Sequence, residues 1–231
     1  MKIVGVSLYK LDLLAWGGES RYSPAQVLEA PLETNVVRIE TDTGLVGWGE
    51  GCVAPPFYAP TLAAGAREGI RYLVPLLLGA DPRAHRRILE AARAGLRGHG
   101  PSIAAIDMAL WDLVGKIYGA PLVDLWGGRV ADDMEVLAMV SIGTPDETVE
   151  RMEDYRTGGY KTFQIKIGLG SAEEDIEKIT RVQGALRPGE RAWYDVNRGW
   201  TIDQAMQVLP QVRHLAPLIE QPCETYRECA I

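Results

Sequence analysis

The stretch Thr-Phe-Gln-Ile-Lys-Ile-Gly at residues 162–168 places a lysine inside a run that otherwise has the composition of a buried strand. β-branched and aromatic residues that end at a glycine predict a strand. The strand period of two then puts Gln164 and Lys166 on one face and the apolar residues on the other. Lys166 is therefore expected to point towards polar surroundings.

This strand belongs to a repeat. Strand-like runs lie at residues 136–142, 162–168, 192–196 and 217–219, with a helix-like segment in each interval. Polar residues mark their carboxyl ends at Ser141, Lys166, Asp195 and Glu220, which are 25, 29 and 25 residues apart. Strand and helix alternating at this length predict a parallel βα architecture.

The first half of the chain has a different pattern. Residues 1–14, 35–41 and 45–51 predict three strands of an antiparallel meander, with a turn at Thr-Asp-Thr-Gly, residues 41–44. Apolar stripes at helical spacing predict helices over residues 61–78, 82–96 and 101–118. We interpret residues 16–26 as a polar loop and residues 121–130 as a linker. The prediction is an α+β domain over residues 1–125 and a βα domain over residues 126–231.

Composition narrows the function. The formal net charge of −7 argues against nucleic acid or an anionic membrane surface as the main partner and favours a small or metal-bound ligand. Three cysteines without a CxxC pair favour a reducing compartment. The N-terminus does not have the pattern of a signal peptide, and no apolar run approaches the ~18 residues of a membrane span. We expect a cytoplasmic protein.

The strand ends carry the candidate chemistry. In a βα barrel the carboxyl ends of the strands converge on one pocket, so Lys166, Asp195 and Glu220 are expected to meet there. Two neighbouring carboxylates repel each other unless a cation lies between them, and oxygen ligands favour Mg²⁺. Such a cation would disfavour the ammonium form of Lys166 and favour the neutral amine of a base. The residues predict a metal that holds a substrate carboxylate beside a proton-abstracting lysine.

Five motifs carry a resemblance to a known family. They are DTGLVGWGE at residues 42–50, AIDMALWDLVGK at 105–116, the segment 159–168 ending in Lys-Ile-Gly, DVNRGW at 195–200 and EQP at 220–222. The sequence resembles the enolase superfamily in its mandelate racemase and muconate lactonizing enzyme branch. The resemblance implies an N-terminal capping domain followed by the first half of a (β/α) barrel of the TIM type. It also implies Lys166 as the base, Asp195 and Glu220 as Mg²⁺ ligands, and an enediolate intermediate stabilised by the metal.

The sequence departs from the family pattern in two ways. Gln164 replaces the first lysine of the family's Lys-x-Lys motif, and a neutral amide can bind a substrate but carries no charge. Four βα steps fit before Ile231, whereas a closed barrel has eight. The resemblance implies a third acidic ligand and a second acid/base beyond Ile231. The sequence is therefore interpreted as truncated, and the 231-residue chain alone is expected to be inactive.

Within the family, Gln164, the Pro-Pro-Phe-Tyr loop at residues 55–58 and the EQPC segment at 220–223 look most like enzymes of proline derivatives. The implied lyase or isomerase reaction is dehydration of cis-3-hydroxy-L-proline or epimerisation of a proline betaine. The alternatives are an N-acylamino acid racemase, a dipeptide epimerase, a muconate cycloisomerase, or an inactive fragment that serves as a binding module. We also expect a homo-oligomer.

Other residues are candidates for substrate contact. Gln164 lies beside the base, and Asn197 either approaches the metal site or caps the following helix. Trp16 and Tyr58 lie in the two loops that, by the resemblance, close over the substrate. The alternative for these two aromatic residues is ordinary packing in the capping domain.

Overall fold

A computed structural model describes residues 1–13, 20–23, 26–28, 32–53 and 62–231. The chain divides into two compact units. The first unit contains Met1–Ala15 and Ala30–Asp132, and the second contains Trp16–Glu29 and Asp133–Ile231. In the described parts, no helix is both long enough and apolar enough to cross a membrane.

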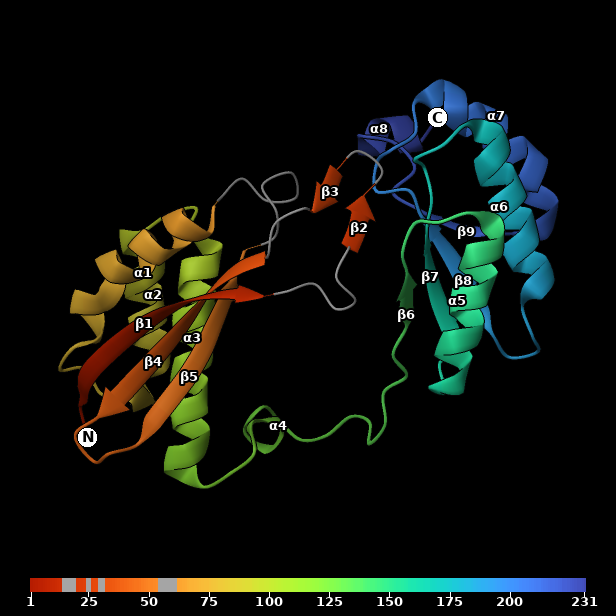
Figure 1. Cartoon of the computed structure of the whole chain (residues 1–231). Coiled ribbons are helices and arrows are strands. Elements are labelled where there is room, and N and C mark those ends of the chain that lie inside the picture. Colours follow the sequence, from red (N-terminus) through yellow and green to blue (C-terminus); the bar gives the residue numbers. More distant parts are fainter. Residues whose placement is uncertain (14–19, 24–25, 29–31, 54–61) are drawn as a thin grey trace. The chain divides into compact units, whose positions relative to one another are not determined.

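The first unit is a three-stranded antiparallel sheet covered on one face by helices (Figure 1). The strand order is β1-β4-β5, with β1 at Ile3–Leu13, β4 at Leu32–Thr41 and β5 at Val46–Cys52. The helices are α1 (Ala63–Leu77), η1 (Pro82–Ala84), α2 (His85–Gly95), α3 (Gly100–Tyr118) and α4 (Leu122–Leu125). The predicted meander and the three predicted long helices are confirmed.

Glycines let β5 approach α3 closely. Gly47, Gly49 and Gly51 alternate on the buried face of β5. A Cβ atom added at Gly49 would lie 2.0 Å from the carbonyl oxygen of Ala105 in α3. Because neither backbone can move without shifting its whole element, this position accepts only glycine.

We expect Gly49→Ala to destabilise the first unit by about 3 kcal/mol or more, the upper end of overpacking effects, because the added methyl meets a backbone carbonyl. Urea unfolding measures the change. Gly5→Ala is the matched control, since the nearest atom to its added Cβ is Glu40 Cβ at 3.7 Å, an ordinary contact. Equal stability of the two variants would contradict this account of the packing.

The second unit contains a four-stranded parallel sheet in the order β6-β7-β8-β9. The strands are β6 (Ala138–Val140), β7 (Thr162–Lys166), β8 (Arg191–Asp195) and β9 (Leu218–Glu220). The connecting helices are α5 (Pro145–Thr157), α6 (Ala172–Ala185) and α7 (Ile202–Val212), followed by η2 (Arg213–Leu215) after α7 and by α8 (Tyr226–Cys229) after β9. The predicted βα repeat is confirmed, and the mixed α/β fold fits a partial barrel.

Each connecting helix begins with a capping box. Thr144, Ser171 and Thr201 are the N-cap residues of α5, α6 and α7, and each forms a capping box with the Glu or Gln three residues later. The hydroxyl accepts a hydrogen bond from one backbone N–H, and the longer side chain accepts one from the N-cap N–H. The sequence therefore fixes where each helix starts after its strand.

The alternation within the strands separates a face packed in the core from a face that carries polar side chains. Phe163, Ile165 and Tyr194 are fully buried in the core formed with the helices, which lie together on one side of the sheet (Figure 1). Gln164 and Lys166 have the opposite parity and lie on the other face.

Two predicted segments were wrong in part. Residues 16–26, interpreted as a loop, include β2 (Ser20–Ser23), which pairs antiparallel with β3 (Gln26–Leu28). These strands are too short to show a clear alternation in the sequence. The segment interpreted as a linker, 121–130, contains the single helical turn α4, which begins after Pro121.

Candidate active site

Three neighbouring strands bring the predicted lysine and acids into one row. Lys166 ends β7, Asp195 ends β8 and Glu220 ends β9. Lys166 is the register partner of Asp195, and Asp195 is the register partner of Glu220. Side chains at paired positions of a sheet point to the same face, so all three point to the face opposite the helices.

Hydrogen bonds connect the side chains of this row, directly between Lys166 and Asp195 and through Gln164 between Asp195 and Glu220. Lys166 Nζ lies 2.5 Å from Asp195 Oδ2 and also donates to Asn197 Oδ1 at 2.8 Å. Gln164 Nε2 donates to Glu220 Oε2 at 2.8 Å and lies 3.5 Å from Asp195 Oδ2. The structure thus brings together five of the residues predicted from sequence: Gln164, Lys166, Asp195, Asn197 and Glu220.

The loops after β8 and β9 hold these groups with unusual backbone conformations. Asn197, Arg198 and Gln221 have positive φ angles of 49°, 67° and 43°. The Asn197 N–H donates to Asp195 Oδ1 at 2.9 Å, and the Arg198 N–H donates to the Gln221 carbonyl at 2.7 Å. Such conformations in non-glycine residues cluster at functional sites. Sequence analysis missed the part played by Arg198 and Gln221, because their contact joins two loops that are distant in sequence.

Burial sets the electrostatics of the cluster. Lys166 and Asp195 are only 3% and 2% exposed, whereas Glu220 and Gln164 are half-buried. Each member of the buried ion pair offsets part of the desolvation cost of the other. With the amine protonated, the three ionisable groups carry a formal charge of −1, and with the amine neutral they carry −2. The cluster can therefore balance a divalent cation when the lysine is a base.

The donor set fits Mg²⁺ as a partial site. Asp195 and Glu220 offer carboxylate oxygens at adjacent strand ends, and the Gln164 amide lies within reach of both carboxylates. Mg²⁺ is commonly held by one or two carboxylates together with waters and substrate oxygens. Within the described ranges, no group of three or more His, Cys, Asp or Glu side chains is arranged to hold a metal.

Cys223 lies close in sequence to Glu220 but does not resemble a nucleophile. The side chain is buried, and burial raises the pKa of its thiol. A thiol that stays protonated is a packing residue. Trp16 and Tyr58, the predicted loop contacts, lie outside the described residues.

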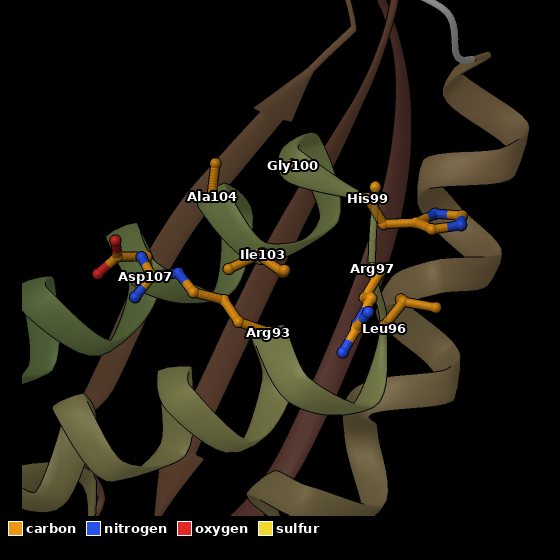
Figure 2. Close-up of a pocket in the computed structure, with 9 residues that line it drawn as sticks. Arg93, Leu96, Arg97, His99, Gly100, Ile103, Ala104 and Asp107 are labelled. Carbon is orange, nitrogen blue, oxygen red and sulfur yellow. The ribbon is translucent and has the colours of Figure 1, made fainter.

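A separate hollow of about 560 Å³ lies in the first unit, between α2 and α3 (Figure 2). Figure 2 shows Arg93 and Asp107 on one side of it, with Arg97 and His99 on the other. Two arginines and one aspartate offer no pair of converging acids and no lysine. The hollow therefore does not suit metal-assisted proton abstraction, and the cluster on β7, β8 and β9 is the better candidate.

Comparison with known proteins agrees with this fold. Residues 25–127 match the family described as mandelate racemase / muconate lactonizing enzyme, N-terminal domain, and residues 147–230 match the enolase C-terminal domain-like family. The first match includes β4, β5 and the helices of the antiparallel unit, and the second includes most of the βα unit. The chain belongs to the enolase superfamily, in its mandelate racemase and muconate lactonizing enzyme branch.

Individual members of the family show how similar this chain is to proteins of known activity or structure. The chain is 38% identical to a cis-3-hydroxy-L-proline dehydratase of Roseibium aggregatum over 99% of this chain and 62% of that protein. It is 32% identical to an L-Lys-D/L-Arg epimerase of Desulforapulum autotrophicum over 96% of this chain and 61% of that protein. A solved structure of an enolase superfamily member from Roseovarius nubinhibens ISM, complexed with magnesium, matches with a TM-score of 0.87 and 37% identity, over 99% of this chain and 61% of the other. The chain spans about three fifths of the length of these relatives.

Proposed function

We propose that the protein removes the α-proton of a small carboxylate substrate and that Lys166 is the base. The observation that carries the proposal is the row of Lys166, Asp195 and Glu220 at three paired strand ends. A bound Mg²⁺, held by Asp195 and Glu220, would supply positive charge next to the substrate carboxylate, where negative charge develops as the proton leaves.

Neighbouring residues orient the base, shield it from water and offer a hydrogen bond to the substrate. Asn197 accepts a hydrogen bond from Lys166 Nζ at 2.8 Å, which orients the amine. The low exposure of Lys166 excludes water from the proton that it takes up. Gln164 lies beside both acids and can donate to a substrate oxygen, in the place where a second lysine would add a positive charge.

The substrate we propose is a proline derivative such as cis-3-hydroxy-L-proline, with loss of the β-hydroxyl after the α-proton. The support is the 38% identity to a cis-3-hydroxy-L-proline dehydratase over nearly the whole of this chain. The second candidate is a 1,1-proton transfer with reprotonation on the opposite face. It is supported by the 32% identity to an L-Lys-D/L-Arg epimerase.

Exchange of the α-proton in D₂O, followed by ¹H NMR, tests both candidates. The assay uses the complete gene product with Mg²⁺ and offers cis-3-hydroxy-L-proline, proline betaine and the dipeptide L-Lys-L-Arg in turn. We expect loss of the α-proton signal of cis-3-hydroxy-L-proline with formation of a dehydrated product, and EDTA is expected to abolish it.

The pattern of exchange separates the candidates. Exchange of the dipeptide alone would move the assignment to an epimerase. Absence of exchange with all three substrates at saturating Mg²⁺ would refute the proline assignment and the dipeptide alternative together.

A further inference from the structure

A buried carboxylate on α6 connects the loops that follow β7 and β8. Asp175 is only 2% exposed. Its Oδ1 accepts a hydrogen bond from the Gly168 N–H at 3.0 Å, and its Oδ2 accepts one from Trp200 Nε1 at 2.7 Å. Asp175 itself lies outside the row of candidate site residues.

The first of these contacts fixes the end of β7. Gly168 lies two residues after Lys166 and has a φ of 90°. A Cβ atom at Gly168 would lie 2.6 Å from Val196 Cγ1, so the loop passes directly against the end of β8. The Ile167 N–H, between Lys166 and Gly168, donates to the Asp195 carbonyl at 3.1 Å. The position of Lys166 relative to Asp195 is therefore set within a few residues of the Asp175 contact.

The second contact reaches the other two strands. Trp200 is 3% exposed and follows Asp195 by five residues. Its backbone N–H donates to the Pro222 carbonyl at 3.1 Å, and Pro222 follows Glu220 by two residues. A chain of hydrogen bonds thus runs from Asp175 to the loops behind all three members of the row.

The chemistry of Asp175 suits this arrangement in its ionised form. A carboxylate accepts at both oxygens and needs no donor, and it meets two N–H donors here. Burial raises the pKa of Asp175, so the site carries a desolvation cost that an apolar side chain would avoid. An asparagine at this position could accept only one of the two hydrogen bonds, because its N–H₂ group would face the other N–H donor.

We propose that Asp175 is a positioning residue that holds Lys166, Asp195 and Glu220 in register by clamping Gly168 and Trp200. The inference rests on the proposed function for its kinetic consequence and on the geometry alone for its structural one. Proton transfer is sensitive to misplacement, and an error of about 1 Å can cost about 10²-fold in rate.

Asp175→Asn and Trp200→Phe test the clamp, since each removes one of its hydrogen bonds and keeps most of the packing volume. We expect kcat for α-proton exchange to fall about 10- to 100-fold with KM changed less than about 2-fold. The double variant is expected to lose little more than either single variant, because both remove the same clamp.

Tyr194→Phe is the matched control. Tyr194 is fully buried on β8, and its hydroxyl donates to the carbonyl of Ile179 in α6 at 3.3 Å. Its loss removes one buried hydrogen bond from the same unit and is expected to leave kcat unchanged. A fall in kcat equal to that of Trp200→Phe would overturn the inference.

A crystal structure of Trp200→Phe gives a readout that does not depend on activity. We expect the separation of Lys166 Nζ and Asp195 Oδ2 to increase beyond hydrogen-bond distance. An unchanged separation would overturn the inference, whether or not the protein exchanges any substrate. An inactive wild-type protein with the expected displacement would instead reject the proposed function and keep the clamp.

Discussion

Replacing Lys166 by glutamine is expected to lower the rate of α-proton exchange about 10²- to 10⁴-fold, the usual contribution of a general base. Glutamine can still donate a hydrogen bond to Asp195, whose carboxylate is 2% exposed and would otherwise lose its nearest donor. The variant therefore removes the base with the least damage to the buried cluster. Exchange in D₂O, measured by NMR, gives the rate directly.

Lys166→Arg separates the base from the charge. Arginine keeps a positive charge beside Asp195 but cannot give up its proton in a protein, so it is expected to lose the same activity as glutamine. Lys161→Met is the matched control, because Lys161 is exposed just before β7 and lies outside the site. Full activity in Lys166→Arg would show that the charge matters rather than proton abstraction, and would refute Lys166 as the base.

Much of the second unit could be predicted because the order of polar and apolar residues within each strand shows which side chains share a face. The alternation in Thr-Phe-Gln-Ile-Lys separates the packed face of β7 from the face that carries Lys166, and β8 repeats the pattern with Asp195. The repeated strand–helix spacing predicts that these strands are neighbours in a parallel sheet, and their register pairs Lys166 with Asp195 and Asp195 with Glu220. The clustering of lysine and acids was therefore accessible from the chain alone.

The supporting contacts were not accessible in this way. Asp175 occupies an ordinary position in an amphipathic helix, and its partner Trp200 is 25 residues away. The positive φ at Arg198 accompanies a hydrogen bond from its N–H to the Gln221 carbonyl in another loop. Such contacts join segments that no local period connects, so the sequence predicts which residues meet but not what holds them in place.

A buried ion pair at the opposite end of the sheet illustrates the same limit and has a large expected effect on stability. Arg156 Nε and Nη2 donate to the two carboxylate oxygens of Glu190, each at 2.7 Å, and Nη2 also donates to the Ala185 carbonyl at 2.9 Å. The side chains of Arg156 and Glu190 are only 7% and 8% exposed. Arg156 also lies over the ring of Phe163, with 5.6 Å from Cζ to the ring centroid.

We expect Glu190→Gln to lower the free energy of unfolding by about 3 kcal/mol, the lower end of the range for a broken buried ion pair, because it leaves the buried Arg156 guanidinium with only the half-exposed Glu153, 2.6 Å from its Nη1, as a counter-charge. Urea unfolding followed by circular dichroism measures the loss. Asp146→Asn is the control, since the ion pair of Asp146 with Arg181 has side chains 82% and 62% exposed and such pairs contribute about 0–1 kcal/mol. A loss below about 1 kcal/mol in Glu190→Gln would mean that solvent screens the pair despite its burial.

The pH dependence of this loss follows from the same contact. The hydrogen bond from Arg156 lowers the pKa of Glu190 below its ordinary value, so the folded protein binds a proton there less readily than the unfolded chain. The stability that Glu190 contributes is therefore fully present above the unfolded pKa of about 4.3 and is lost as the pH falls through the lower folded value. The difference in unfolding free energy between wild type and Glu190→Gln is expected to be constant from about pH 6 to 8 and to shrink below about pH 4. A difference that stays constant down to pH 3 would contradict a charged Glu190 as the source of the stabilisation.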